Sequence, residues 1–110
     1  MDIYFSSNKD MRIFNSDREL QKKYGHLSKK IQQRLVELRA VNFLADISDS
    51  PPPRRHKLVN DREGQWAVDL NGNKRLIFEP SNDPIPKTET GAIDLTKVTE
   101  ITIIEVADYH

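Results

Sequence analysis

Three consecutive prolines, Pro51–Pro53, divide the chain into two parts with different hydrophobic periodicities. Proline has a fixed φ and no amide hydrogen, so this run cannot continue a helix or lie in a central strand. Apolar residues recur at helical spacing before the run and alternate as in strands after it. A length of 110 residues fits a single domain over residues 1–110. The prolines are therefore expected to be a stiff connector within one domain.

The part before the prolines predicts a short strand and two helices. Residues 3–5 alternate as in a strand. Ser16 and Glu19 have the spacing of a capping box, and Gly25 is a natural helix stop, which predicts a helix that ends near Tyr24. The second helix is predicted over residues 27–40. Its apolar stripe is formed by Leu27, Ile31, Leu35 and Leu38, with Val36 beside them.

The basic side chains of that second helix, Arg34 among them, are expected on its solvated side. Residues 43–47 are expected to add a short turn that packs back on the core. Together these patterns predict a helical first half that covers a sheet built mainly from the second half.

Strand patterns dominate the part after the prolines. Residues 66–70 alternate apolar and polar side chains, and Asn71-Gly72-Asn73 is a hairpin turn signal before a returning strand over residues 75–78. In that strand Leu76 and Phe78 are expected to face one way, and Arg75 and Ile77 the other. Residues 80–96 are predicted to be a long loop, and residues 98–106 a last strand. The predicted fold class is α+β, with N-terminal helices packed on a small, mainly antiparallel sheet.

Composition and charge exclude several classes of protein. The chain has no cysteine, which excludes a disulfide scaffold and a cysteine-ligated zinc site. It has no membrane-length apolar run and no signal-peptide pattern at its start, so we expect a cytoplasmic protein without a membrane partner. The net charge is zero, but residues 1–78 carry 15 Lys or Arg against 10 Asp or Glu, and residues 79–110 carry 2 against 7. A local anion-binding surface on the basic part is compatible with this distribution.

Several cationic and proton-transferring side chains gather around the predicted sheet. No phosphate loop or dinucleotide motif is present, and the histidines lack metal-ligand spacing, so neither a cofactor nor a metal is expected. Cutting RNA without a metal requires a base, a cation at the phosphate and an acid, which histidine and arginine can supply. The candidates are His56, Lys57, Arg62, Lys74, Arg75, Tyr109 and His110.

Each candidate also has a purely structural alternative. His56 could be a polar loop residue, and Arg75 could be a strand cation that faces a carboxylate such as Glu105. Tyr109 could lie against the edge of the core. If Arg75 lies opposite the end of the last strand, it can meet the segment Asp108-Tyr109-His110 across the ladder.

Three segments resemble the HigB-like branch of the RelE/ParE toxin superfamily. The run from His56 to Trp66 is similar to the signature His-x-Leu-Lys-Gly-x-(Arg/Lys)-x-Gly-x-(Trp/Leu), and Asn73-Lys74-Arg75-Leu76-Ile77-Phe78 to Asn-x-Arg-(Leu/Ile)-x-Phe. The ending Val106-Ala107-Asp108-Tyr109-His110 resembles the family's closing (Glu/Asp)-Asp-Tyr-His. The resemblance implies a RelE-like fold and the toxin of a type II toxin–antitoxin system, a ribosome-dependent endoribonuclease that cuts mRNA without a cofactor.

The same resemblance implies roles for individual residues. His56, Arg75, Tyr109 and His110 match the positions that matter for catalysis, with Arg75 at the scissile phosphate, Tyr109 on the RNA, and the two histidines as acid and base in either order. Lys57, Arg62, Lys74 and Asp108 would contact RNA or its phosphates. The implied partners are a HigA-like helix-turn-helix antitoxin, the ribosome and mRNA, with DNA bound only indirectly through the antitoxin.

The chain departs from the family pattern at two places. Val59-Asn60 replaces the usual Lys-Gly, which removes a cation near the phosphate, and the 80–96 loop is longer than in compact members. Two other functions therefore remain open. One is a toxin of the ParE type that inhibits gyrase without cutting RNA, and the other is a weakly active member that acts mainly as an antitoxin-bound co-repressor.

Overall fold

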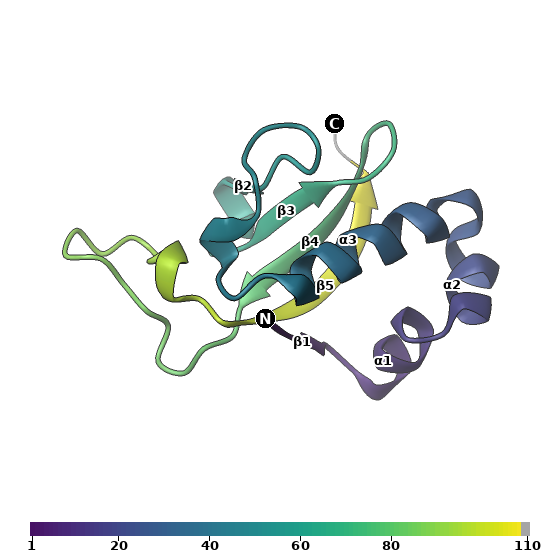
Figure 1. Cartoon of the computed structure of the whole chain (residues 1–110), viewed down its shortest axis with the longest axis horizontal. Helices are drawn as coiled ribbons and strands as arrows, with labels where there is room; N and C mark the ends of the chain where they lie inside the picture. The colour runs from purple at the N-terminus through teal and green to yellow at the C-terminus, as the bar shows by residue number, and fades with distance from the viewer. Residues whose placement is uncertain (109–110) are drawn as a thin grey trace.

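The computed structural model describes residues 1–108, which form an α+β fold with helices against one side of a sheet (Figure 1). In chain order the strands and helices are β1 (Asp2–Phe5), α1 (Asn8–Phe14), α2 (Asp17–Tyr24), α3 (Ser28–Ala40), β2 (His56–Lys57), β3 (Trp66–Asp69), β4 (Lys74–Pro80) and β5 (Glu100–Asp108). Short 3-10 turns lie at η1 (Gly25–Leu27), η2 (Leu44–Asp46), η3 (Asn60–Arg62) and η4 (Leu95–Lys97). The predicted fold class is confirmed.

Serine side chains start the first two helices. Ser16 Oγ accepts from the Glu19 amide at 3.2 Å, and α2 ends before Gly25, whose φ of 59° suits glycine, so the predicted helix is confirmed. A further helix, α1, precedes it and was not predicted. Ser7 Oγ caps it by accepting from the Asp10 amide at 3.1 Å. With 7 residues, α1 is too short to show a clear apolar period.

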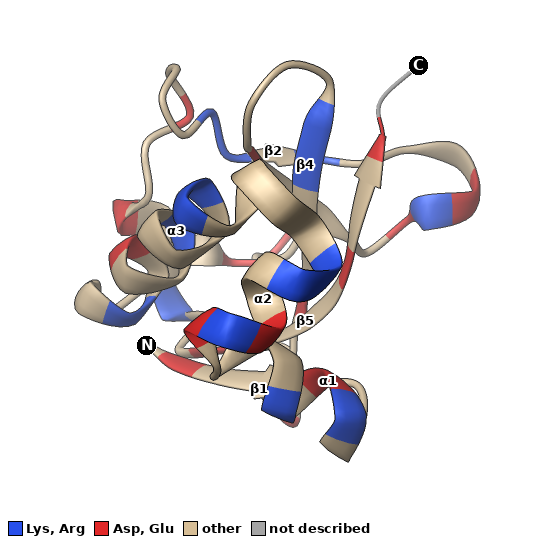
Figure 2. Cartoon of the chain, turned by 90° about the vertical axis from the view of Figure 1, so that its right-hand side faces the viewer, with Lys and Arg blue, Asp and Glu red and all other residues tan. Residues whose placement is uncertain are grey.

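Helix α3 confirms most of the predicted apolar stripe and differs from the prediction at two residues, Arg34 and Val36. Ile31, Leu35 and Leu38 are buried, as expected. Arg34, expected on the solvated side, is only 2% exposed, because its Nε donates to the main-chain carbonyl of Asp69 at 2.6 Å. Val36 is 64% exposed, so it lies outside the stripe. Figure 2 shows Lys, Arg, Asp and Glu residues along α1, α2 and α3.

The described strands form a mixed sheet in the order β1-β5-β4-β3-β2. Neighbouring strands from β5 to β2 are antiparallel, and β1 pairs parallel to β5 at the other edge. The predicted hairpin is confirmed between β3 and β4, where the Leu70 amide donates to the Lys74 carbonyl at 2.9 Å across the Asn71–Asn73 turn. The mainly antiparallel sheet is therefore confirmed, and its parallel edge strand is an addition that local patterns do not reveal.

The core lies between the helices and one face of the sheet. Leu76 and Phe78 point into it, as predicted, and Trp66 packs against it. Leu44 and Ile47 close the core beside the helices, which confirms the predicted turn. The other core residues include Leu20, Ile31, Leu35, Leu38, Val68, Val98, Ile101 and Ile103.

The opposite side of strands β2 to β5 is here called the outer face. In-register partners in a sheet share a face, so the row His56, Ala67, Ile77 and Glu105 lies on it. A bulge at Ile77/Phe78 shifts the register, which lets Ile103 face the core while Glu105 faces outward. At the centre of the outer face, Ala67 and Ile77 are buried.

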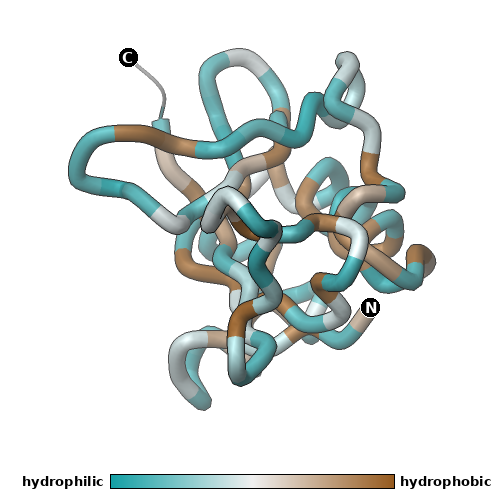
Figure 3. Tube along the Cα trace, turned by 90° about the vertical axis from the view of Figure 1, so that its left-hand side faces the viewer, coloured by the Kyte–Doolittle hydropathy of each residue, from teal (hydrophilic) through white to brown (hydrophobic). Residues whose placement is uncertain are grey.

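The segment predicted as the 80–96 loop follows β4 and has hydrogen bonds of its own. Lys87 pairs with Ile93, and the Thr88 amide donates to the Ala92 carbonyl at 2.8 Å. Asn82 anchors the base of the loop, since its side-chain oxygen accepts from the Thr99 amide at 3.1 Å. Most of the loops that face the viewer in Figure 3 are hydrophilic.

Two negative findings concern residues 1–108. None of their helices combines the length and the apolar character that a membrane span requires. In the same residues no three histidine or carboxylate side chains gather as ligands for a metal ion.

Candidate functional site

Two of the predicted catalytic residues share the outer face. His56 on β2 lies opposite Ala67, and two residues further along β3 Asp69 lies opposite Arg75 of β4. Arg75 in turn lies opposite Ala107 near the end of β5, which is the geometry expected for it. The antiparallel ladder therefore brings His56, Asp69 and Arg75 to the same end of this face.

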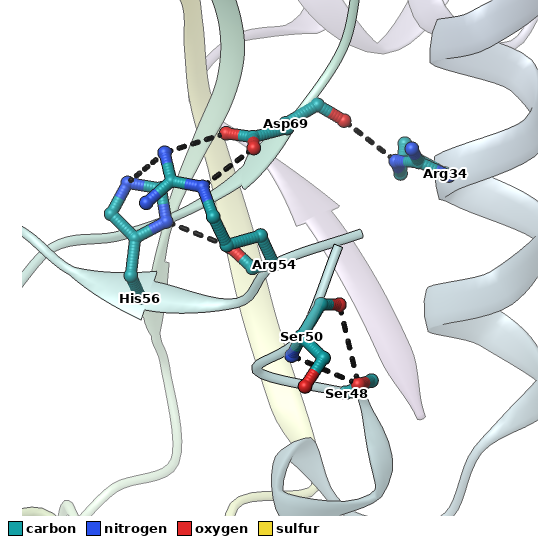
Figure 4. Close-up of polar contacts among 6 residues, drawn as sticks. All are labelled: Arg34, Ser48, Ser50, Arg54, His56 and Asp69. Atoms are coloured by element: carbon teal, nitrogen blue, oxygen red, sulfur yellow. Dashed lines mark hydrogen bonds and ion pairs between the residues drawn. The ribbon is translucent and has the colours of Figure 1, made fainter. Parts of the chain in front are cut away.

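The hydrogen bonds of His56 fix the position of its proton. Its Nδ1 lies 2.7 Å from the main-chain carbonyl oxygen of Arg54. A carbonyl oxygen only accepts, so Nδ1 carries the hydrogen and Nε2 is the unprotonated nitrogen of the neutral ring. Nε2 faces Nη2 of Arg54 at 3.5 Å (Figure 4).

The surroundings of His56 keep its ring neutral. Partial burial lowers the pKa of His56 below its ordinary value, and the positive charges of Arg54 and Arg75 lower it further. The Arg54 carbonyl and the Asp69 carboxylate oppose this shift without cancelling it. A histidine in this state can accept a proton at neutral pH.

Arg54 is held against His56 by Asp69. Its Nε and Nη2 donate to the two carboxylate oxygens of Asp69 at 2.6 Å and 2.9 Å, a bidentate pair (Figure 4). The Asp69 amide also donates to the Pro53 carbonyl at 2.8 Å, which ties the preceding residue to β3. Arg54 has a φ of 55°, a conformation that costs free energy for a residue with a side chain. Such strain persists only where surrounding contacts enforce it.

Arg75 is a charged residue in a nearly enclosed position. It is 6% exposed, so water screens its charge weakly and its field acts on the neighbouring groups of the outer face. After burial and Arg54, the positive charge of Arg75 contributes to the lowered pKa of His56.

Arg62 reaches the outer face from η3. Its Nη2 lies 3.0 Å from a carboxylate oxygen of Glu105, and its Nη1 donates to Gln65 at 2.9 Å. The pair joins the segment before β3 to β5, and Glu105 is in register with Ile77, which is in register with Ala67.

The three other predicted RNA contacts lie on the opposite side of the sheet. Lys57 pairs with Trp66, a residue of the core face, and lines a groove of about 590 Å³ with Trp66 and Ile93. Lys74 and Asp108 are in-register partners that form an ion pair beside the β3–β4 turn. The structure therefore brings His56, Arg62 and Arg75 to one face and does not bring Lys57, Lys74 or Asp108 there.

Two predicted catalytic residues, Tyr109 and His110, lie outside the described residues. Sequence reasoning also did not single out Arg54, which contacts the His56 ring, or Asp69, which holds Arg54. They are 15 residues apart, and no local motif joins them. A weak signal exists in the run Arg54-Arg55-His56, where a cation next to a histidine can tune its proton affinity.

Comparisons with known proteins find a shared fold. No protein-family model matches the chain, and no curated protein matches it in sequence. Among solved structures, the YoeB/ParE toxin from Agrobacterium tumefaciens matches over 100% of both chains with a TM-score of 0.57 and 13% identity. The YoeB-YefM complex from Staphylococcus aureus matches over 100% of this chain and 97% of that chain, with a TM-score of 0.55 and 19% identity. The chain has the fold seen in these YoeB/ParE-type toxins.

Proposed function

We propose that this chain is the toxin of a type II toxin–antitoxin pair and that it cuts mRNA on the ribosome. The observation that carries the proposal is the neutral His56 on the same sheet face as Arg75, with Arg54 against its ring. The shared fold with YoeB/ParE-type toxins supports the toxin assignment. His56 and Arg75 on the outer face provide two of the three groups that metal-free RNA cleavage requires, a base and a cation.

The proposed chemistry is general acid–base cleavage within the RNA backbone. A base removes the proton of the 2′-hydroxyl, O2′ attacks the phosphorus, and an acid protonates the leaving O5′. His56 and His110 take the two proton roles, Arg75 stabilises the phosphate charge, and Tyr109 orients the RNA. Arg62 supplies a further cation to the RNA on the same face. This leaves Lys57, Lys74 and Asp108 away from the reacting phosphate, on the other side of the sheet.

The partners follow from the same proposal. The S. aureus neighbour is a YoeB-YefM complex, which supports an antitoxin as a partner of this chain. On the motifs of residues 56–66, 73–78 and 106–110 we assign the chain to the HigB-like branch, with a HigA-like helix-turn-helix antitoxin. DNA is then bound only through the antitoxin, and the toxin acts in the cytoplasm, where ribosomes and mRNA meet.

The test is to map transcript ends after expression of the chain in bacteria. Wild type should stop growth and produce new 5′ ends that follow the codon phase. Arg75→Ala should abolish both effects yet still copurify with the antitoxin, and Arg39→Ala, which alters an exposed cation of α3, should behave as wild type. Growth arrest with intact transcripts and inhibited DNA supercoiling would instead identify a gyrase inhibitor. Growth without arrest or cuts would leave only the co-repressor role.

A further inference from the structure

We propose that Arg54, clamped by Asp69, is a positioning residue that holds His56 as a neutral imidazole with Nε2 ready to accept a proton. His56 is then the general base of the cleavage step, and the acid must be another residue. This inference rests on the proposed function for the reaction, but the state of His56 can be measured without it.

The first support is that one residue contacts both nitrogens of the ring. The main-chain carbonyl of Arg54 accepts from Nδ1 at 2.7 Å, and its guanidinium lies 3.5 Å from Nε2. The carbonyl selects the tautomer with hydrogen on Nδ1. A fixed positive charge beside Nε2 then disfavours a second proton there. Both effects leave Nε2 unprotonated at neutral pH, which is the state from which a general base takes a proton.

The second support is that Arg54 has little freedom to leave this position. Asp69 holds its guanidinium by two hydrogen bonds, and the Asp69 amide holds the Pro53 carbonyl at 2.8 Å. Asp69 is itself fixed from the other side of the sheet by Arg34, whose Nε donates to the Asp69 carbonyl at 2.6 Å (Figure 4). A chain of contacts therefore runs from the buried face of α3 through β3 to the ring of His56.

The charged groups that face His56 come from three elements. Arg54 precedes it on the chain, Asp69 lies on β3, and Arg75 lies on β4. Along the row of His56 the outer face also carries Glu105 of β5, which is paired with Arg62. Two of the three facing groups are cations. The lowered pKa of His56, caused first by burial and then by these cations, agrees with the neutral ring that the geometry selects.

The step that this arrangement supports is balanced in protons and electrons. Nε2 of His56 takes the proton of the 2′-hydroxyl, O2′ forms a bond to phosphorus, and the bond from phosphorus to O5′ breaks. A separate acid donates a proton to O5′, which leaves a 2′,3′-cyclic phosphate and a free 5′-hydroxyl. His56 then returns its proton to solvent or to that acid, so no oxidant or other reactant is needed.

The test is an NMR titration of the imidazole nitrogens of His56 in the free full-length chain. Arg54→Met and Arg54→Lys form a matched pair, because both are unbranched, carry the same backbone strain and keep the carbonyl. Wild type should show hydrogen on Nδ1 and a pKa below the ordinary value of about 6.5. In Arg54→Met the pKa of His56 should rise, because a nearby positive charge is lost, and in Arg54→Lys it should stay near that of wild type.

A second readout follows the reaction on ribosomes. The rate of mRNA cleavage should fall as pH drops through the pKa of His56. The pH at which it falls should be higher in Arg54→Met than in wild type, and unchanged in Arg54→Lys. Hydrogen on Nε2 in wild type, or equal titration in the two variants, would overturn the role of Arg54 whatever the reaction is. If the titrations follow the prediction but wild type cuts no RNA, the proposed function is wrong, while the positioning role of Arg54 is confirmed.

Discussion

The guanidinium of Arg34 and the main chain of Asp69 join the helical layer to the candidate site. Arg34 Nε donates to the Asp69 carbonyl at 2.6 Å, while the carboxylate of the same Asp69 holds Arg54. The Arg34 side chain is 3% exposed, and its Nη1 pairs with Glu37 at 3.0 Å. A buried charge therefore connects α3 to the residues around His56.

Arg34→Met should reduce the free energy of unfolding by about 2 kcal/mol, because it removes the Arg34 donor from the Asp69 carbonyl and breaks the ion pair with Glu37. Arg39→Met is the matched control on the same helix, since the exposed Arg39 side chain donates to the side chain of Asn15, and the substitution keeps the main-chain carbonyl that accepts from the N-terminus. Arg39→Met should lower the free energy of unfolding by less than about 0.5 kcal/mol. Urea unfolding of the three proteins measures both values. Equal losses for the two variants would show that the buried contact contributes nothing beyond a surface arginine.

The lowered pKa of His56 predicts how stability depends on pH. Burial and neighbouring cations lower it in the folded chain, so the unfolded chain binds more protons in the window between the folded value and about 6.5. The contribution of neutral His56 to the unfolding free energy is fully present above the pKa of the unfolded chain. It is lost as pH falls from that pKa through the pKa of the folded chain. His56→Gln should therefore flatten the decline of the unfolding free energy below pH ~6.5 relative to wild type.

Unfolding curves at a series of pH values measure this difference, with His26→Gln as the control for removing a histidine outside this contact network. If the unfolding free energy fell more steeply with falling pH in His56→Gln than in wild type, His56 would be charged in the folded chain. That result would also remove the basis for its role as a proton acceptor.

Local signals in the sequence predicted the elements that depend on nearby residues. The capping box of Ser16 and Glu19 and the Asn71–Asn73 turn each place an element boundary through contacts a few residues apart. The parallel pairing of β1 with β5 joins residues about a hundred positions apart, and no local pattern encodes it. Periodicity also misjudged Arg34, because its burial depends on a carbonyl 35 residues away.

The candidate site shows the same division. His56 and Arg75 could be selected from residue type and resemblance, and the register of the sheet then places them on one face. Lys57 is adjacent to His56 in sequence, yet the alternation of a strand turns it to the other face. Arg54 and Asp69 become partners only when the chain folds, so the clamp on His56 could not be predicted from local sequence.

The placement of the cations predicts different effects for Lys57 and Arg62. Arg62→Ala should lower ribosome-dependent cleavage about tenfold, the loss expected for one charge-assisted contact of about 1.4 kcal/mol. Lys57→Ala should change it less than about twofold, because its side chain lies on the face away from His56. Initial cleavage rates at fixed ionic strength compare the two variants. A larger loss for Lys57→Ala would place the RNA at the edge of β2 and its groove, away from the outer face.

We propose that the outer face of the sheet, acting with Tyr109 and His110, cuts RNA. The most direct measurement uses purified chain, ribosomes programmed with a short defined mRNA, and analysis of both new RNA ends. Wild type should cut the mRNA only when it is bound on the ribosome, leaving a cyclic phosphate and a 5′-hydroxyl, whereas Arg75→Ala and a chain that lacks His110 should not cut. Intact mRNA with folded wild type, or full cleavage by both variants, would show that these residues do not cut RNA.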